Sequence, residues 1–320
     1  MAAFFDYLLT SAILGMTFLY GCTGEIITEK AGHLNLGIPG IMCIGGTCGC
    51  LSLRLMFESG IHPILATLIA ILATIIGGAL MGLLYSFLTV TLKANQNVTG
   101  LAMTIFGAGM TKFIMSRIST VTTAYQYLYG LKYFRFPFAD STSAFKYFGV
   151  LSYMAIFIAL TAAFVLNRTK VGLHLRAVGE NPATADAAGI NVTLYKYVAT
   201  CIGSAIAALG GLFYIMDFSG SAESYKSIEA LGWLSVALVI FTLWRPNLSI
   251  IGSILFGMLY LAGTRIPTLL GISLKMSATP LLQMLPYAVT IIVLIVTSVR
   301  KQRENQPPAS LGIPYFREER

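Results

Sequence analysis

PILATLIAILATIIGGALMGLLYSFLTVTL, residues 63–92, contains no charged side chain. The hydrocarbon core of a bilayer is about 30 Å thick and is crossed by roughly 20 mostly apolar helical residues. In lipid only a helix or a closed barrel satisfies every backbone polar group. This stretch is more than long enough, and it therefore predicts a transmembrane helix.

The whole chain has the composition of a membrane protein. Of its 320 residues 56% are apolar and 11% are charged, and the mean hydropathy is +0.78. A soluble domain has roughly 25% charged residues. The net charge of +8 is dispersed between apolar runs without the dense basic patch of a nucleic-acid binder. Most of the exterior is therefore expected to face lipid, and no nucleic-acid partner is expected.

Eight further apolar runs resemble the first. With it, the predicted spans are Tyr7–Gly24, Leu36–Phe57, Pro63–Leu92, Val98–Met115, Phe145–Leu166, Leu194–Met216, Ile228–Leu243, Leu248–Gly263 and Leu281–Val299. The sequence thus predicts an all-α fold, a polytopic transmembrane helical bundle of about nine spans. We expect a transmembrane domain over residues 1–299 and a cytoplasmic tail over residues 300–320.

Positive charge predicts the orientation, because short cytoplasmic loops retain Lys and Arg. Two groups of basic residues stand out: Arg168, Lys170 and Arg176 in the polar segment 167–193, and Arg300, Lys301 and Arg303 in the tail. Four predicted spans separate them, and an even number returns the chain to the same side. Both are therefore expected in the cytoplasm, which leaves the N-terminus outside.

The catalytic and metal-binding motifs of enzymes are missing from the sequence. There is no GxxxxGK[ST], HExxH or GxSxG pattern, and His33, His62 and His174 are scattered. We therefore expect no enzymatic activity, no metal and no cofactor in this chain. No acidic residue falls at the centre of a predicted span, whereas ion-coupled carriers usually need ionisable groups there. If the chain transports a solute, the energy is expected to come from a source other than ion coupling within this chain.

The polar segment 167–193 contains the signals of a short helix. Asn181 can cap the free N–H groups at a helix N-terminus, and Pro182 suits the first helical position. Gly189 suits the left-handed conformation of the residue that ends a helix. Between them lies a surface of small side chains: Ala183, Ala185, Ala187 and Ala188. A solvated connector would not need such a surface, whereas docking into a groove of another protein would. A docking helix is the favoured interpretation.

Four strings carry a resemblance to a known family. They are Gly179–Asn191, with Gly-Glu-Asn-Pro at its start, Glu29–Asn35, Gln96–Leu101 and Ala309–Tyr315. Together they resemble the permeases of ABC importers for nucleosides and simple sugars, which depend on a lipoprotein and belong to the ribose and branched-chain amino acid permease group. The resemblance extends over nearly the whole chain.

The resemblance implies a division of labour between subunits. A separate subunit would bind ATP and Mg, an external substrate-binding lipoprotein would deliver the solute, and a sister permease or a second copy would complete the pathway in a bacterial cytoplasmic membrane. Segment 167–193 would be the coupling loop. The residues implied in ATPase coupling are Gly179, Glu180, Asn181, Pro182, Ala187 and Gly189.

The cargo is less well defined. Pro39 and Thr104 replace a Glu and a polar amide of the usual nucleoside-type pattern. Candidate pathway residues are Asn35, Gln96, Asn97, Thr99, Thr104 and Trp233. Structural hydrogen bonds between helices are the alternative role of the polar ones, and an anchor at the membrane interface is the alternative role of Trp233. We expect a nucleoside as cargo, with riboflavin or a simple sugar as alternatives. A secondary carrier or channel is the alternative of another class.

Overall fold

The computed structural model describes residues 2–118, 148–270, 284–300 and 306–316, and within these ranges every regular element is helical. The α-helices are α1 (Ala2–Lys30), α2 (Ile38–Glu58), α3 (Pro63–Ser86), α4 (Gln96–Ile118), α6 (Val150–Arg168), α7 (Lys170–Glu180), α8 (Pro182–Ala187), α9 (Val192–Phe213), α10 (Ile228–Phe241), α11 (Pro246–Leu270) and α13 (Leu285–Arg300). Three short segments complete the set: the π-helical η1 (Phe87–Thr91) and η4 (Tyr214–Ser219), and the 3-10 helix η5 (Ala222–Ser227).

The all-α transmembrane bundle predicted from the sequence is confirmed. Eight of the described helices are long and apolar enough to cross a membrane, and they correspond to the first eight predicted spans, although residues 145–147 of the fifth lie outside the described ranges. The ninth corresponds to α13, whose apolar part, Leu285–Val296, is shorter, and residues 281–283 lie outside the described ranges. The first span was predicted too short, since α1 continues beyond Gly24 to Lys30.

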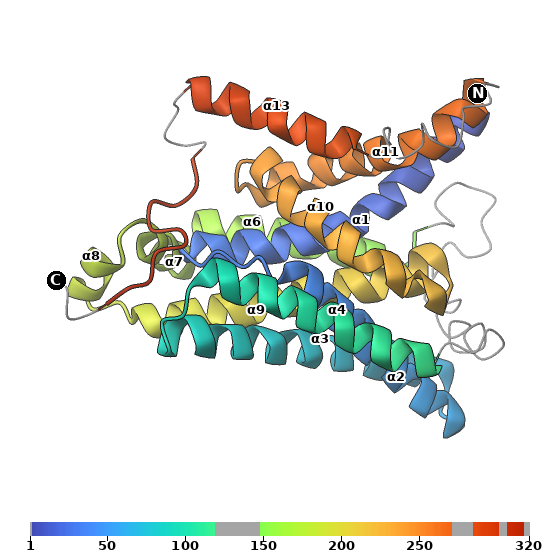
Figure 1. Ribbon diagram of the computed structural model, residues 1–320, viewed down its shortest axis with the longest axis horizontal. Helices are drawn as coiled ribbons and strands as arrows, with labels where there is room; N and C mark the ends of the chain where they lie inside the picture. The colour runs from blue at the N-terminus through green and yellow to red at the C-terminus, as the bar shows by residue number, and fades with distance from the viewer. Residues whose placement is uncertain (1, 119–147, 271–283, 301–305, 317–320) are drawn as a thin grey trace.

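Helices α1, α2 and α9 form the centre of the bundle. α9 packs against all of α1, α2 and α3, while α10 and α11 pack against α1 (Figure 1). Glycines allow the central helices to approach closely. A Cβ at Gly24 of α1 would collide with the Gly203 carbonyl oxygen of α9, and one at Gly211 would collide with that of Met42 in α2. Small residues at such crossings are typical of helix packing in membranes.

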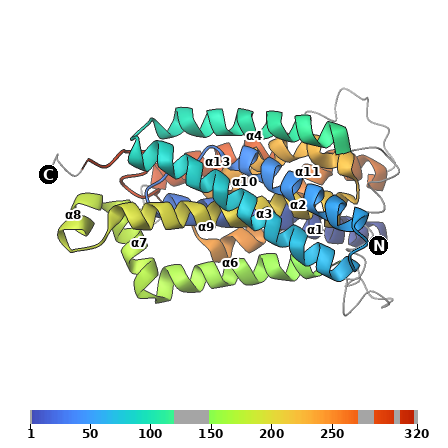
Figure 2. The same cartoon turned by 90° about the horizontal axis from the view of Figure 1, so that it is seen from below.

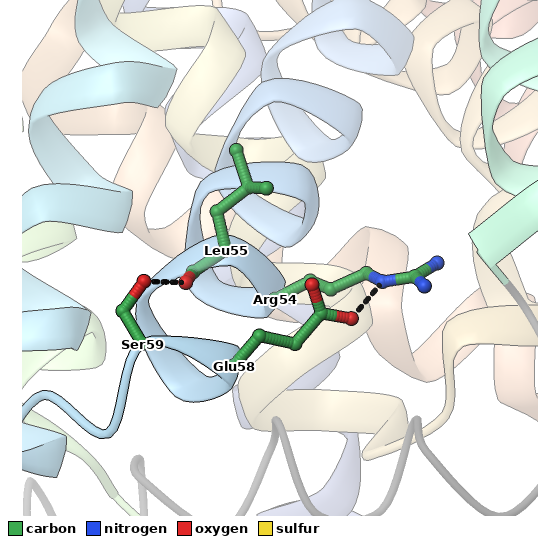
Figure 3. Close-up of polar contacts among 4 residues, drawn as sticks. All are labelled: Arg54, Leu55, Glu58 and Ser59. Carbon is green, nitrogen blue, oxygen red and sulfur yellow. Dashed lines mark hydrogen bonds and ion pairs between the residues drawn. The ribbon is translucent and has the colours of Figure 1, made fainter.

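The C-terminus of α2, which lies furthest from α7 and α8, contains two local polar contacts. Arg54 Nε donates to Glu58 Oε1 at 2.8 Å, and Ser59 Oγ donates to the Leu55 carbonyl oxygen at 2.8 Å (Figure 3). Both satisfy polar groups where the helix ends and the chain turns toward Pro63, the first residue of α3. An exposed ion pair of this kind contributes about 0–1 kcal/mol, so it shapes the turn more than it stabilises the fold.

The outward faces of the peripheral helices are apolar. Large exposed side chains there include Leu72, Ile76 and Leu80 on α3, Ile105 on α4 and Phe157 on α6. A water-soluble exterior would not carry such faces, and the chain is an integral membrane protein. α7, α8 and the C-terminal segment, residues 306–316, lie at one end of the bundle, and the N-terminus lies at the opposite end (Figures 1 and 2).

Candidate coupling site

The polar segment folds into two helices, α7 and α8. Thr169 caps α7 by accepting from the Gly172 N–H at 3.2 Å, and Asn181 caps α8 by accepting from the Thr184 N–H at 3.0 Å. Pro182 occupies the start of α8, and Gly189 ends the segment with φ +83. The predicted short helix is confirmed together with its capping chemistry. α7 was missed, because its amphipathic residues were interpreted as part of a loop.

The C-terminal segment lies on the α7–α8 pair. The Ser310 N–H donates to the Gly179 carbonyl oxygen at 3.1 Å, and the Ser310 hydroxyl donates to the same oxygen. The Tyr315 hydroxyl donates to Asp186 Oδ2 at 2.9 Å, and the Ala309 N–H reaches Glu180 Oε2 at 3.4 Å. The tail, predicted only as a cytoplasmic extension, thus holds both helices through its described part.

Gly179 is the point where α7 meets the end of α1. A Cβ at this position would collide with the Lys30 carbonyl oxygen, so only glycine permits the approach. Beside it, Val178 and Ala185 are buried in a small apolar cluster with Val192, against which Tyr315 packs. The inner side of α7 and α8 is therefore fixed to the bundle.

The opposite side of the α7–α8 pair is open. Among the residues implied in coupling, Glu180, Asn181, Ala187 and Gly189 are exposed, Pro182 is half-buried and Gly179 is buried. A Cβ at Gly189 would meet no atom within 4 Å. Ala187, Ala188 and Gly189 are therefore small exposed residues at the end of the bundle, whereas Ala185, which was predicted on the same surface, is buried against the bundle.

Three predicted pathway residues converge on the connection between α1 and α2, residues 31–37, hereafter the α1–α2 loop. Gln96 Oε1 accepts from the Leu34 N–H at 2.8 Å, and Asn35 Oδ1 accepts from the Gly37 N–H at 3.0 Å. Thr104 Oγ1 donates to the Leu36 carbonyl oxygen at 2.8 Å. Their visible role is to satisfy the backbone of a buried loop; that they line the pathway stays a prediction.

The other three pathway candidates lie elsewhere. Asn97 is exposed at the start of α4, Thr99 is buried one turn later and Trp233 is half-buried on α10. Within the part of the chain that the structure describes, no hydrogen bond joins any of them to the α1–α2 loop. The candidates therefore do not form a single cluster.

Two buried carboxyl groups were missed. Glu25 and Glu29 occupy the last two turns of α1 and are almost fully buried. Glu25 Oε1 accepts from the Asn35 N–H at 3.0 Å, and Glu29 accepts from the Trp244 indole N–H. Ending the first predicted span at Gly24 left both residues outside that span. Two acidic residues one turn apart after an apolar run are nevertheless a usable signal of a buried polar site.

Trp244 belongs to the turn between α10 and α11. Both Leu243 and Trp244 have positive φ there, at 54° and 56°, an unusual backbone conformation for large side chains. The turn aims the indole at the end of α1, so Glu29 connects α1 to the α10–α11 turn while Glu25 connects it to the α1–α2 loop.

Comparison with known proteins adds a family to this geometry. The family described as the permease component of the branched-chain amino acid transport system matches residues 6–294. A nucleoside ABC transporter permease, NupC of Lactococcus lactis, is 29% identical over 88% of this chain and 89% of its own. A guanosine ABC transporter permease, NupQ of Bacillus subtilis, is 28% identical over 93% and 92%. A putative glucose ABC transporter permease, TsgC13 of Haloferax volcanii, is 31% identical over 74% and 70%. No solved structure gives a significant match.

The family match begins within α1 and ends within α13, so it includes all eight long apolar helices as well as α7 and α8. Membrane spans, fold and relatives agree with the resemblance seen in the sequence. The chain belongs to the family of permease components of the branched-chain amino acid transport system.

Proposed function

We propose that this permease is the translocating subunit of an ABC importer for a nucleoside, driven by a separate ATPase. The observation that supports it most is the α7–α8 pair, an exposed capped helix whose inner side is fixed to α1. The relatives named nucleoside and guanosine ABC transporter permeases, which match over most of their length, support the same cargo.

A conformational change of the ATPase would displace α8, and α7 would pass this displacement to the membrane-spanning helices. The exposed side chains of Glu180, Asn181 and Ala187 would contact the ATPase, and Pro182 and Gly189 would set the ends of the docked helix. Gly179 abuts Lys30, so a displacement of α7 would be transmitted to α1 and the buried α1–α2 loop. These residues would transmit motion and perform no chemistry.

The orientation follows from the same proposal. The α7–α8 pair and the C-terminal segment would face the cytoplasm, in agreement with the positive charge of Lys170 and Arg176 in α7, and the N-terminus would face outside. An external lipoprotein would deliver the solute on that side, and a sister permease or a second copy would complete the pathway.

The cargo is tested by uptake. In proteoliposomes that contain this chain, its ATPase, its sister permease and its lipoprotein, labelled guanosine should enter with ATP, and unlabelled nucleosides should compete. A second candidate, a simple sugar, is favoured by the glucose permease relative. Competition by glucose but not by nucleosides would replace the nucleoside assignment, and competition by riboflavin alone would replace both.

A further inference from the structure

A polar cavity of about 360 Å³ lies beside the α7–α8 pair. Its walls come from the α1–α2 loop, from η1 and the turn after it, from the start of α4, from the α8–α9 connection and the first turn of α9, and from the C-terminal segment. Binding pockets for small molecules measure roughly 300–1,000 Å³, so a small metabolite fits this space.

Lys196 of α9 lines the cavity and is only 3% exposed. Its ammonium group forms no hydrogen bond or ion pair with any residue that the structure describes. A lysine charge buried without a partner is costly, because the group loses its hydration and gains nothing in return. An anion in the cavity would remove that cost.

Gln96 supplies a second unused donor. Its Oε1 is engaged by the Leu34 N–H, but its buried Nε2 has no partner among the described residues. His33 also lines the cavity, and burial, followed by the charge of Lys196, lowers its pKa to about 3. The imidazole is therefore neutral near pH 7 and adds no charge of its own.

The first turn of α9 adds backbone donors. Val192 and Thr193 line the cavity at the N-terminus of this 22-residue helix. Asn191 caps the Leu194 N–H at 3.0 Å, whereas the N–H groups of Val192 and Thr193 have no acceptor within the helix. The positive end of the helix dipole points the same way and favours an anion.

The remaining charges leave the cavity positive. Lys93 lines it as well, and its ammonium lies 4.2 Å from the centroid of the Phe316 ring in the C-terminal segment. Asp186 is the acidic side chain of the lining, and its Oδ2 is engaged by the Tyr315 hydroxyl. The cavity lining therefore contains two lysines and a helix N-terminus but one carboxylate, and its net charge is positive.

We propose that this cavity binds the phosphate group of a small anionic metabolite. Lys196 and Lys93 would supply the charge, and Gln96 and the amides of Val192 and Thr193 would direct hydrogen bonds to the phosphate oxygens. Because the walls come from the C-terminal segment and the α8–α9 connection together, an occupied site ties these elements to each other. The proposal does not depend on which solute the permease carries.

Thermal unfolding of the full-length chain in detergent tests the site. Inorganic phosphate and adenosine 5′-monophosphate should each raise the midpoint above that in chloride of equal ionic strength. Lys196→Met should raise the midpoint without phosphate, since it removes an unpaired buried charge. The same variant should weaken phosphate binding about tenfold or more, because charge-assisted hydrogen bonds are lost.

Lys170→Met is the matched control, since Lys170 is exposed at the start of α7 and lies outside the cavity. It should keep the full phosphate response. A lipid headgroup is distinguished in nanodiscs of phosphatidylcholine with or without phosphatidylglycerol. Stabilisation that depends on Lys196 but appears only with phosphatidylglycerol would overturn the small-metabolite assignment. A phosphate response no greater than that of chloride, or one unchanged in Lys196→Met, would overturn the site itself.

Discussion

The Tyr315 hydroxyl donates a hydrogen bond to Asp186 Oδ2 at 2.9 Å, and so joins residues 129 positions apart. This contact connects the C-terminal segment to α8, and Ser310 makes the corresponding connection to α7 through the Gly179 carbonyl oxygen. The C-terminal segment therefore stabilises the pair of helices that would receive the ATPase.

Tyr315→Phe and Ser310→Ala should each loosen the C-terminal segment without disturbing the spans. Loss of one hydrogen bond costs about 0.5–1.5 kcal/mol, so both variants should insert normally. Limited proteolysis of the segment should become faster in the variants, and fastest in the double variant. Ser116→Ala is the control, because that exposed hydroxyl only donates to the Phe113 carbonyl oxygen of its own helix. Equal cleavage rates in wild type, the two single variants and the double variant would contradict the stabilising role.

Gly179 and Gly189 should differ in their tolerance of a methyl group. Gly179→Ala forces a Cβ against the Lys30 carbonyl oxygen and should destabilise the protein by about 1–3 kcal/mol through overpacking. Gly189→Ala meets open space and incurs only the strain of its positive φ, about 1 kcal/mol. Thermal unfolding should rank Gly179→Ala below Gly189→Ala and wild type. The reverse order would refute the close approach of α7 to α1.

Trp244→Phe should destabilise the protein by about 1–3 kcal/mol, since the buried carboxyl group of Glu29 loses its indole donor. Trp233→Phe is the matched control, because that half-buried indole donates to no described residue. We expect its unfolding midpoint to stay near that of wild type. If the two substitutions proved equally mild, the bridge between α1 and the α10–α11 turn would not stabilise the fold.

His33 should make stability depend on pH. Burial and then the charge of Lys196 lower its folded-state pKa to about 3, compared with about 6.5 in an unfolded chain. As the pH falls below the higher value, the unfolded chain takes up a proton that the folded chain does not. Stability is therefore lost between these two values, by up to about 1.4 kcal/mol per pH unit.

His33→Gln should flatten that dependence, because Gln carries no titratable group. The unfolding midpoint of wild type should fall more steeply than that of the variant as the pH is lowered from neutral. Parallel curves would show that His33 is not held neutral in the folded protein.

α8 could be predicted from sequence because its signals are local, whereas the rest of the site depends on contacts between residues far apart in the sequence. Asn181, Pro182 and Gly189 act on their immediate neighbours, and capping rules therefore located the helix from sequence alone. The end of α1 was missed because Glu25 and Glu29 find donors at Asn35 and Trp244, 10 and 215 residues away. No local pattern indicates such partners.

The same limit applies to the C-terminal segment and to Gln96. Ser310 meets Gly179 across 131 residues, and Gln96 meets Leu34 across 62. The apolar runs predicted the spans well because lipid acts on each run separately. Which helices meet at the centre depends on glycines such as Gly24 and Gly203, whose partners become visible only in three dimensions.

ATP-driven uptake in proteoliposomes tests most directly whether α8 receives the ATPase. Glu180→Arg and Gly189→Trp should abolish uptake and association with the ATPase while insertion stays normal, and Gly189→Ala should retain both as the control for backbone strain. Unchanged uptake in Glu180→Arg and Gly189→Trp would contradict the account, as would uptake by the permease without an ATPase along an ion gradient.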